Sequence, residues 1–193
     1  MSTSEFPIYA ALAAFIAWSV IERAFSLSGR QQRGGAVLER GSYRLISLAW
    51  YAVVLVSLLD AFSLGWTLLP PAWRALRWCG IPLALLGLYL RVRARRDLGA
   101  QYSVQVETSA AHRLVTVGVY RRIRHPAYLG LLCLLFGIPL CAGSLAGLLS
   151  AAACGVPALV HRIRIEEEAL QAWFGESYRT YAGQTSRLIP GVW

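Results

Sequence analysis

The sequence predicts an all-α, polytopic integral membrane protein with about five transmembrane helices. Hydrophobic residues make up 56% of the 193 positions and the mean hydropathy is +0.49, whereas an ordinary soluble domain is about 45–50% apolar. Five apolar runs approach the roughly 20 residues that a helix needs to cross a bilayer. Arginine supplies every basic side chain, and most of the arginines stand in the polar connections between these runs.

The first three predicted spans are residues 6–25, 43–64 and 72–92. A short polar loop joins the first two spans. Pro70 and Pro71 precede the third span and stop any helix before it, because proline lacks the amide donor that a helix interior needs. We assign these three spans to the N-terminal half of a single domain.

Two shorter apolar runs, residues 126–141 and 144–161, are separated by two residues only and are predicted to form a helical hairpin. Their length is marginal for a full crossing. Gly130 and Gly137 share one face of the first hairpin helix, and small residues let helix backbones approach closely in lipid.

Two polar segments are too rich in charge to cross a membrane. Residues 93–124 form a stretch that is too long to be a turn. Residues 165–183 are amphipathic, with large apolar side chains at helical spacing, so we expect them to lie along the membrane surface or to cover a site.

The distribution of arginine predicts the orientation. The first loop, residues 93–124 and the C-terminal tail carry most of the arginines, whereas the opposite side offers only Arg74 and Arg77. Because positive charge collects in cytoplasmic loops, we expect the N-terminus outside and both polar segments in the cytoplasm. The compact length and the all-arginine usage favour a bacterial or archaeal inner membrane.

The composition also argues against several classes of protein. A net charge of +9 would indicate nucleic acid in a soluble protein, but here basic loops at an anionic leaflet account for it, so we expect no nucleic-acid partner. The four cysteines lie in apolar runs without metal-ligand spacing, so we expect no metal site and no disulfide frame. No basic residue precedes the first run, which favours a retained span over a signal peptide.

Three polar clusters fall on the predicted cytoplasmic side: residues 112–130, residues 162–168 and residues 93–106. Basic membrane anchors and a solvated helix end are the plain interpretations. Pro126 is an exception, because a proline in the first turn leaves a helix N-terminus whose free amides and dipole suit an anionic ligand. The residues alone thus indicate a cytosolic pocket between the hairpin and the tail.

An ordered set of motifs then points to a family. Arg124-His125-Pro126-Ala127-Tyr128-Leu129-Gly130 is followed, after the hairpin, by Glu166-Glu167. Over residues 90–190 this pattern resembles the isoprenylcysteine carboxyl methyltransferases and their prokaryotic relatives, with the phospholipid N-methyltransferases as distant kin. RRDLG at 95–99, residues 112–118, 174–181 and 187–190 also match, and Val119 departs from the proline that relatives commonly carry.

The resemblance implies a membrane enzyme that uses S-adenosyl-L-methionine without a Rossmann fold, and no G-x-G-x-x-G is present. With the apolar runs, we expect one domain over residues 1–193, with three spans in 1–92. The resemblance implies that 93–193, including the hairpin at 126–161, is the cofactor-binding and catalytic half. The cofactor-binding residues carried over are His112, Leu114 and Val115 around adenine, and Tyr120, Arg124, His125, Pro126, Tyr128, Glu166 and Glu167 elsewhere.

The implied reaction is methyl transfer to a lipophilic, prenyl-like acceptor that enters from the bilayer. A carboxylate acceptor is already ionised at pH 7 and needs no general base. Arg162, one helical turn before the glutamate pair, is our candidate for orienting that carboxylate. With an amine or thiol acceptor, His125 or Glu167 becomes a candidate base.

Three alternatives stay open at the level of sequence. One is an N- or S-methyltransferase that acts on a phospholipid or another small molecule. A second is an NADPH-dependent membrane reductase, but those enzymes typically carry HPNYxGE, whereas Leu131 follows Gly130 here and Ala127 replaces the asparagine. A third is a non-catalytic membrane protein or transporter, for which Asp60 is the ionisable candidate within a span.

Overall fold

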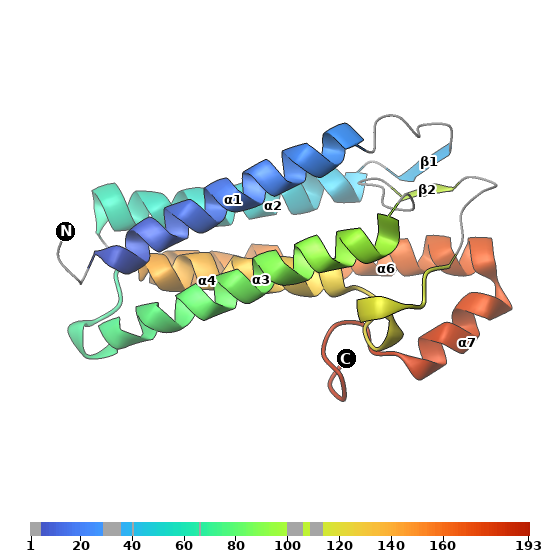
Figure 1. The fold of residues 1–193 in the computed structure, drawn as a ribbon. Helices are drawn as coiled ribbons and strands as arrows, with labels where there is room; N and C mark the ends of the chain where they lie inside the picture. The colour runs from blue at the N-terminus through green and yellow to red at the C-terminus, as the bar shows by residue number, and fades with distance from the viewer. Residues whose placement is uncertain (1–4, 29–35, 40, 66, 100–105, 109–113) are drawn as a thin grey trace.

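The computed structural model describes residues 5–28, 36–39, 41–65, 67–99, 106–108 and 114–193. They form an elongated helical bundle (Figure 1). Its helices are α1 (Phe6–Ser28), α2 (Gly41–Leu59), α3 (Arg77–Leu98), α4 (Pro126–Ala142), α5 (Leu145–Ser150), α6 (Val156–Phe174) and α7 (Glu176–Gln184).

The helices have the lengths that a membrane protein requires. Among the described residues, four helical stretches are long and apolar enough to cross a membrane: Phe6–Ala24, Gly41–Ser63, Pro71–Leu98 and Leu145–Phe174. The apolar helix α4 is shorter, with 17 residues. The prediction of an all-α integral membrane protein is therefore confirmed, and the fifth crossing, by α4, stays a prediction.

The last long stretch differs from the sequence prediction. A π-helical turn, Ala151–Gly155, joins α5 to α6 into one helical stretch. This stretch continues past residue 161, where the predicted span ends, and runs to Phe174, so the glutamate pair lies within it. Gly175 then breaks the chain direction with a φ of 55° before α7 begins. The amphipathic segment 165–183 is thus divided, and only α7 folds back against α6.

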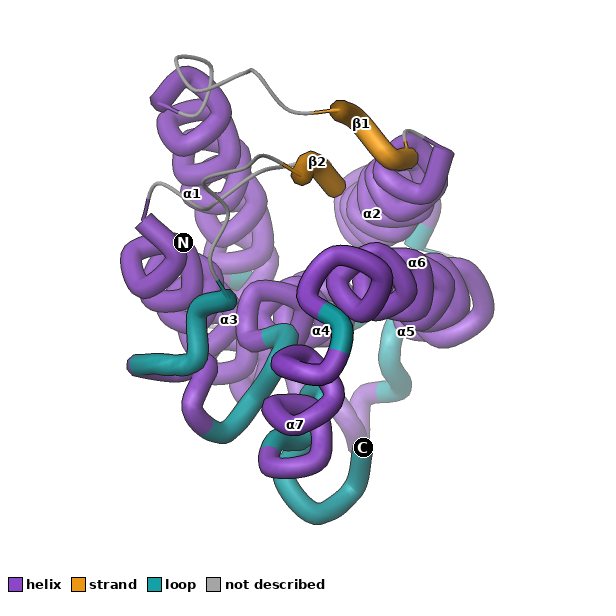
Figure 2. The backbone as a smooth tube through the Cα atoms, turned by 90° about the vertical axis from the view of Figure 1, so that its right-hand side faces the viewer, coloured by secondary structure: helices purple, strands orange, loops and turns teal. Residues whose placement is uncertain are grey.

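A short two-stranded sheet was not predicted. Strand β1 (Ala36–Glu39) pairs antiparallel with β2 (Val106–Thr108), with Ala36 opposite Thr108. Figure 2 shows the two strands side by side, between α1 and α2 in that view. The sheet joins the first polar loop to the 93–124 stretch at the end of the bundle that also carries α7 (Figure 1).

Helices α3 and α4 approach each other at backbone distance. A Cβ added to Gly87 would lie 2.7 Å from the carbonyl oxygen of Gly130, and one added to Gly137 would lie 2.8 Å from the amide nitrogen of Ala84. Such close contact requires glycine at the interface, and in lipid it maximises dispersion attraction between helices. The expected role of Gly130 and Gly137 is confirmed.

Asp60 has a structural environment at the opposite end of the bundle. Its side chain is buried and accepts hydrogen bonds from the hydroxyls of Thr67 and Ser144, each at 2.6 Å. The Ser144 hydroxyl in turn accepts from the amide of Gly147 at 3.0 Å. Asp60 therefore links the end of α2 to the α4–α5 turn. This structural role explains the buried carboxylate, so a function in transport is not needed to explain it.

We predict that Gly87→Ala destabilises the protein by roughly 1–3 kcal/mol, because the added methyl group overpacks the α3–α4 interface. Gly183→Ala is the matched control, since a Cβ there meets nothing within 4 Å. The measurement is the thermal unfolding midpoint in detergent. Equal midpoints for the two variants would contradict the close approach.

Candidate functional site

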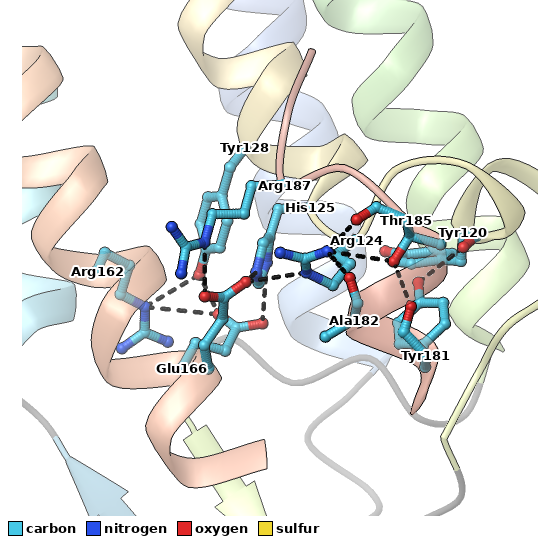
Figure 3. A network of polar contacts seen from close by, with 11 residues as sticks. Tyr120, Arg124, His125, Tyr128, Arg162, Glu166, Tyr181, Ala182, Thr185 and Arg187 are labelled. Carbon is cyan, nitrogen blue, oxygen red and sulfur yellow. Dashed lines mark hydrogen bonds and ion pairs between the residues drawn. The ribbon is translucent and has the colours of Figure 1, made fainter. Parts of the chain in front are cut away.

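A cluster of charged side chains joins the start of α4, the middle of α6 and the C-terminal tail (Figure 3). Arg124 and His125 precede α4, Glu166 and Glu167 lie on α6, and Arg187 follows α7. Glu167 and His125 side chains are 12% and 2% exposed. Buried charges of this kind require partners, because removal from water is costly for an unpaired ion.

The carboxylate of Glu167 contacts the basic side chains of this cluster. One carboxylate oxygen accepts from Nε of Arg124 at 3.0 Å and lies 3.4 Å from Nε2 of His125. The other oxygen accepts from Nε of Arg187 at 2.8 Å. Charge-assisted bonds to two arginines hold three separate segments together through one carboxylate.

Backbone bonds place the Arg-His-Pro segment. The amides of Arg124 and His125 donate to the carbonyls of Ser186 and Arg187, at 2.8 and 3.0 Å. His125 also accepts, through its carbonyl, the amides of Tyr128 and Leu129. Since Pro126 has no amide donor and these two amides bond within the helix, little remains of the anion site expected at this N-terminus.

Arg124 makes more hydrogen bonds than could be expected from the motif. Besides Glu167, its guanidinium donates through Nη1 to the carbonyl of Ala182 at 2.8 Å and to the carbonyl of Thr185 (Figure 3). These carbonyls lie in the last turn of α7 and just after it. Arg124 therefore fixes the end of α7 over the site.

A second set of contacts surrounds Arg162, which is 2% exposed. Its Nε donates to the hydroxyl of Tyr128 at 3.0 Å, and that hydroxyl donates to Glu166 at 2.5 Å. Its Nη1 donates to the hydroxyl of Ser42 at 2.7 Å. Ser42 lies at the start of α2, and the sequence offered no signal for it other than a serine at a helix N-terminus.

Tyr120 is placed by a short 3-10 helix, Gly118–Arg121, in which Gly118 has a φ of 62°. The amide of Val119 donates to the carboxylate of Asp97 at 2.9 Å. A proline at that position would lack this donor, which gives the departure at Val119 a physical reason. Asp97 belongs to the RRDLG motif, so that motif fixes the turn that carries Tyr120.

The hydroxyl of Tyr181, on α7, donates to the carbonyl of Tyr120 at 2.7 Å. Burial raises the pKa of Tyr181 to about 12, against the opposing effect of Arg124, so the phenol stays protonated and remains a donor. Leu114 and Val115 lie partly buried in the segment that leads into the turn. His112 lies outside the described residues.

A third ionic group supports the site from α1 and α3. Glu22 bonds to both Arg91 and Arg95, which are nearly buried. Arg91 also donates to the carbonyl of Ala127 at 3.1 Å, in the first turn of α4. Glu22 could not be predicted from the sequence, because a lone acid near the end of a predicted span has no motif around it.

The cluster suits a ligand that carries both charges. Arg124, Arg162 and Arg187 face Glu166 and Glu167, and the Glu166 side chain is the more open of the two acids at 28% exposure. Such a site can take an ammonium at an acid and a carboxylate near the guanidinium groups. Among the described residues, no group of three His, Cys, Asp or Glu side chains could hold a metal ion.

The sequence is similar to those of known membrane methyltransferases. The sequence pattern of the phospholipid methyltransferase family matches residues 75–177. Protein-S-isoprenylcysteine O-methyltransferases from Tribolium castaneum and Schizosaccharomyces pombe are each 33% identical, over 63% and 54% of this chain and 45% of each relative. One from Arabidopsis thaliana is 32% identical, over 58% of both chains. The chain thus spans about half the length of these curated relatives.

A solved structure shares the fold. The eukaryotic intramembrane Ras methyltransferase, an isoprenylcysteine carboxyl methyltransferase, superposes with a TM-score of 0.72 at 23% identity. The match covers 100% of this chain and 69% of the other. At this identity the likeness establishes only the architecture of the bundle. The family pattern over residues 75–177 and the curated relatives confirm the resemblance first seen in the motifs.

We predict that Glu167→Gln lowers the free energy of unfolding by at least about 2 kcal/mol, because the nearly buried guanidinium of Arg124 and the partly exposed one of Arg187 lose their counter-charge. Glu168→Gln, at an exposed position one residue later, should leave stability within about 0.5 kcal/mol of wild type. Thermal or denaturant unfolding in detergent measures both. If the two variants are equally stable, Glu167 does not hold the segments together.

Proposed function

Because this chain belongs to the phospholipid methyltransferase family, we propose that it is a membrane methyltransferase that uses S-adenosyl-L-methionine. The proposed acceptor is the carboxylate of a lipophilic, isoprenylcysteine-like molecule. The observation that carries this proposal is the convergence of the Arg-His-Pro segment, Tyr128 and the glutamate pair in one cluster, although they are about 40 residues apart in the sequence.

We infer that the cofactor would be held by the charged cluster and by the segment before Tyr120. The candidate for the ammonium group is the Glu166 carboxylate, which is 28% exposed and lies 4.0 Å from Nε of Arg162. Leu114 and Val115 are the apolar candidates for the adenine ring, on the segment before Tyr120. When bound, S-adenosyl-L-methionine supplies a methyl group that is activated by the neighbouring sulfonium.

Arg162 is the proposed orienting residue for the acceptor. Its guanidinium stays protonated at all physiological pH values, so it attracts a carboxylate without competing for a proton. Tyr128 and Ser42 hold it by hydrogen bonds at 3.0 and 2.7 Å, which limits its motion. An acceptor carboxylate is already ionised, so the protein would act by positioning and by exclusion of water.

Glu167 is a weaker candidate for a catalytic base than the sequence implied. Its two oxygens already accept from Arg124 and Arg187, and a carboxylate with such partners binds a proton poorly. This favours a carboxylate acceptor, which needs no base, over an amine or a thiol. With the cluster in the cytoplasm, as the arginine distribution predicts, the lipid part of the acceptor would enter sideways from the bilayer.

The first test is ligand binding to the detergent-purified protein by calorimetry. We expect saturable binding of S-adenosylhomocysteine and none of NADPH, and transfer of a labelled methyl group from S-adenosyl-L-methionine to N-acetyl-S-farnesylcysteine. Binding of NADPH alone would replace this proposal with a reductase. Binding of neither ligand would contradict both enzyme assignments.

In the same assays, Arg162→Lys should lower kcat/KM for the farnesylated acceptor about tenfold or more, because an ammonium cannot reproduce the planar donor pattern of a guanidinium. Its affinity for S-adenosylhomocysteine should stay within about twofold of wild type. Arg164→Lys, at an exposed position on the same helix, is the matched control. Equal transfer rates in both variants would remove Arg162 from the reaction.

A further inference from the structure

Tyr178 on α7 presents a hydroxyl with an unusual environment. The residue is only 3% exposed, and its hydroxyl is one of the few buried polar atoms that lack a hydrogen-bond partner in the described part of the chain. A buried phenol without a partner is unfavourable, because the group has lost its water and gained nothing in return. In a native structure such an atom calls for an explanation.

Packing does not explain the hydroxyl. The ring of Tyr178 meets that of Tyr181 edge to face, with centroids 6.2 Å apart, and phenylalanine would make the same contact. Tyr181, three residues later on the same helix, has its hydroxyl bonded to the carbonyl of Tyr120. The two tyrosines are therefore alike in burial and differ in that one has a partner and the other does not.

The charged groups that act on Tyr178 are those of the site. Burial raises the pKa of Tyr178 above its ordinary value, Glu167 and Glu166 raise it further, and Arg124 acts in the opposite sense. The phenol thus stays protonated and can donate a hydrogen bond. Tyr178 lies one helical turn before Ala182, whose carbonyl accepts from Arg124, so Tyr178 is on the face of α7 that meets the charged cluster.

Several of the groups first expected to bind an anion are already engaged. Nε and Nη1 of Arg124 donate to Glu167 and to the carbonyls of Ala182 and Thr185. The amides of Tyr128 and Leu129 donate to His125. Among the described residues, the Tyr178 hydroxyl is the fully buried donor of α7 that has no hydrogen-bond partner. Glu166, on the helix α6 that packs against α7, supplies an acid for an ammonium.

We propose that Tyr178 is a cofactor-binding residue whose hydroxyl donates a hydrogen bond to the carboxylate of the amino-acid end of S-adenosyl-L-methionine. This inference rests on the proposed function and adds α7 to the cofactor site. In this arrangement the ammonium of the same end binds Glu166, so the zwitterion lies between α6 and α7. Arg124 acts as a positioning residue that holds α7 in place through Ala182 and Thr185.

Tyr178→Phe, which removes only the hydroxyl, tests the assignment by calorimetry with two ligands. S-adenosylhomocysteine carries the amino-acid end, and methylthioadenosine has the same nucleoside thioether without it. We expect the variant to bind S-adenosylhomocysteine about tenfold more weakly or worse, as for a lost hydrogen bond to a charged group. Its affinity for methylthioadenosine should be unchanged. Tyr89→Phe, at an exposed tyrosine of α3, is the matched control.

Unfolding of the ligand-free variants gives a second readout. Tyr178→Phe should unfold at the same temperature as wild type or higher, because the removed hydroxyl makes no bond, while its stabilisation by S-adenosylhomocysteine should be smaller. Unchanged affinity for S-adenosylhomocysteine, or equal weakening of both ligands, would overturn the assignment and leave the proposed function intact. Failure of wild type to bind S-adenosylhomocysteine would overturn both.

Discussion

The carboxylate of Glu167 is the contact on which the site depends. It accepts bonds from Arg124 before α4 and from Arg187 after α7, and it lies beside His125. Arg124 and His125 are neighbours in the chain, whereas Arg187 comes from a distant part of it, and among the described residues none of the three has another acid as close. Because these groups lie at the end of long apolar helices, where an unpaired charge is costly, the ion pairs and the position of the segments are established together.

A series of contacts between α1, α3 and α4 positions the segment that bonds to Glu167. Backbone contact between Gly87 and Gly130 sets α4 against α3. The bond from Arg91 to Ala127, held in place by Glu22, then fixes the first turn of α4. The Arg-His-Pro segment precedes that turn directly, so packing within the apolar bundle determines where the polar site can form.

Much of this could be predicted from the sequence, because apolar runs and ordered motifs are local signals. The long helices follow from run length, and the motif residues Tyr128 and Glu166 do meet. Contacts made by single polar residues could not be predicted: Glu22 and Ser42 carry no pattern of their own, and their partners are 69 and 120 residues away. The β1–β2 pair was missed for the same reason, since register between two short polar segments is a tertiary property.

The central claim is that α6, the Arg-His-Pro segment and the tail with α7 form one ligand site. Hydrogen–deuterium exchange of the detergent-purified protein, with and without saturating S-adenosylhomocysteine, tests it most directly. We expect slower amide exchange in peptides that cover residues 122–128 and 176–187, and unchanged exchange in residues 67–76 at the opposite end of the bundle. Slowing confined to that opposite end, or no slowing at saturation, would contradict it.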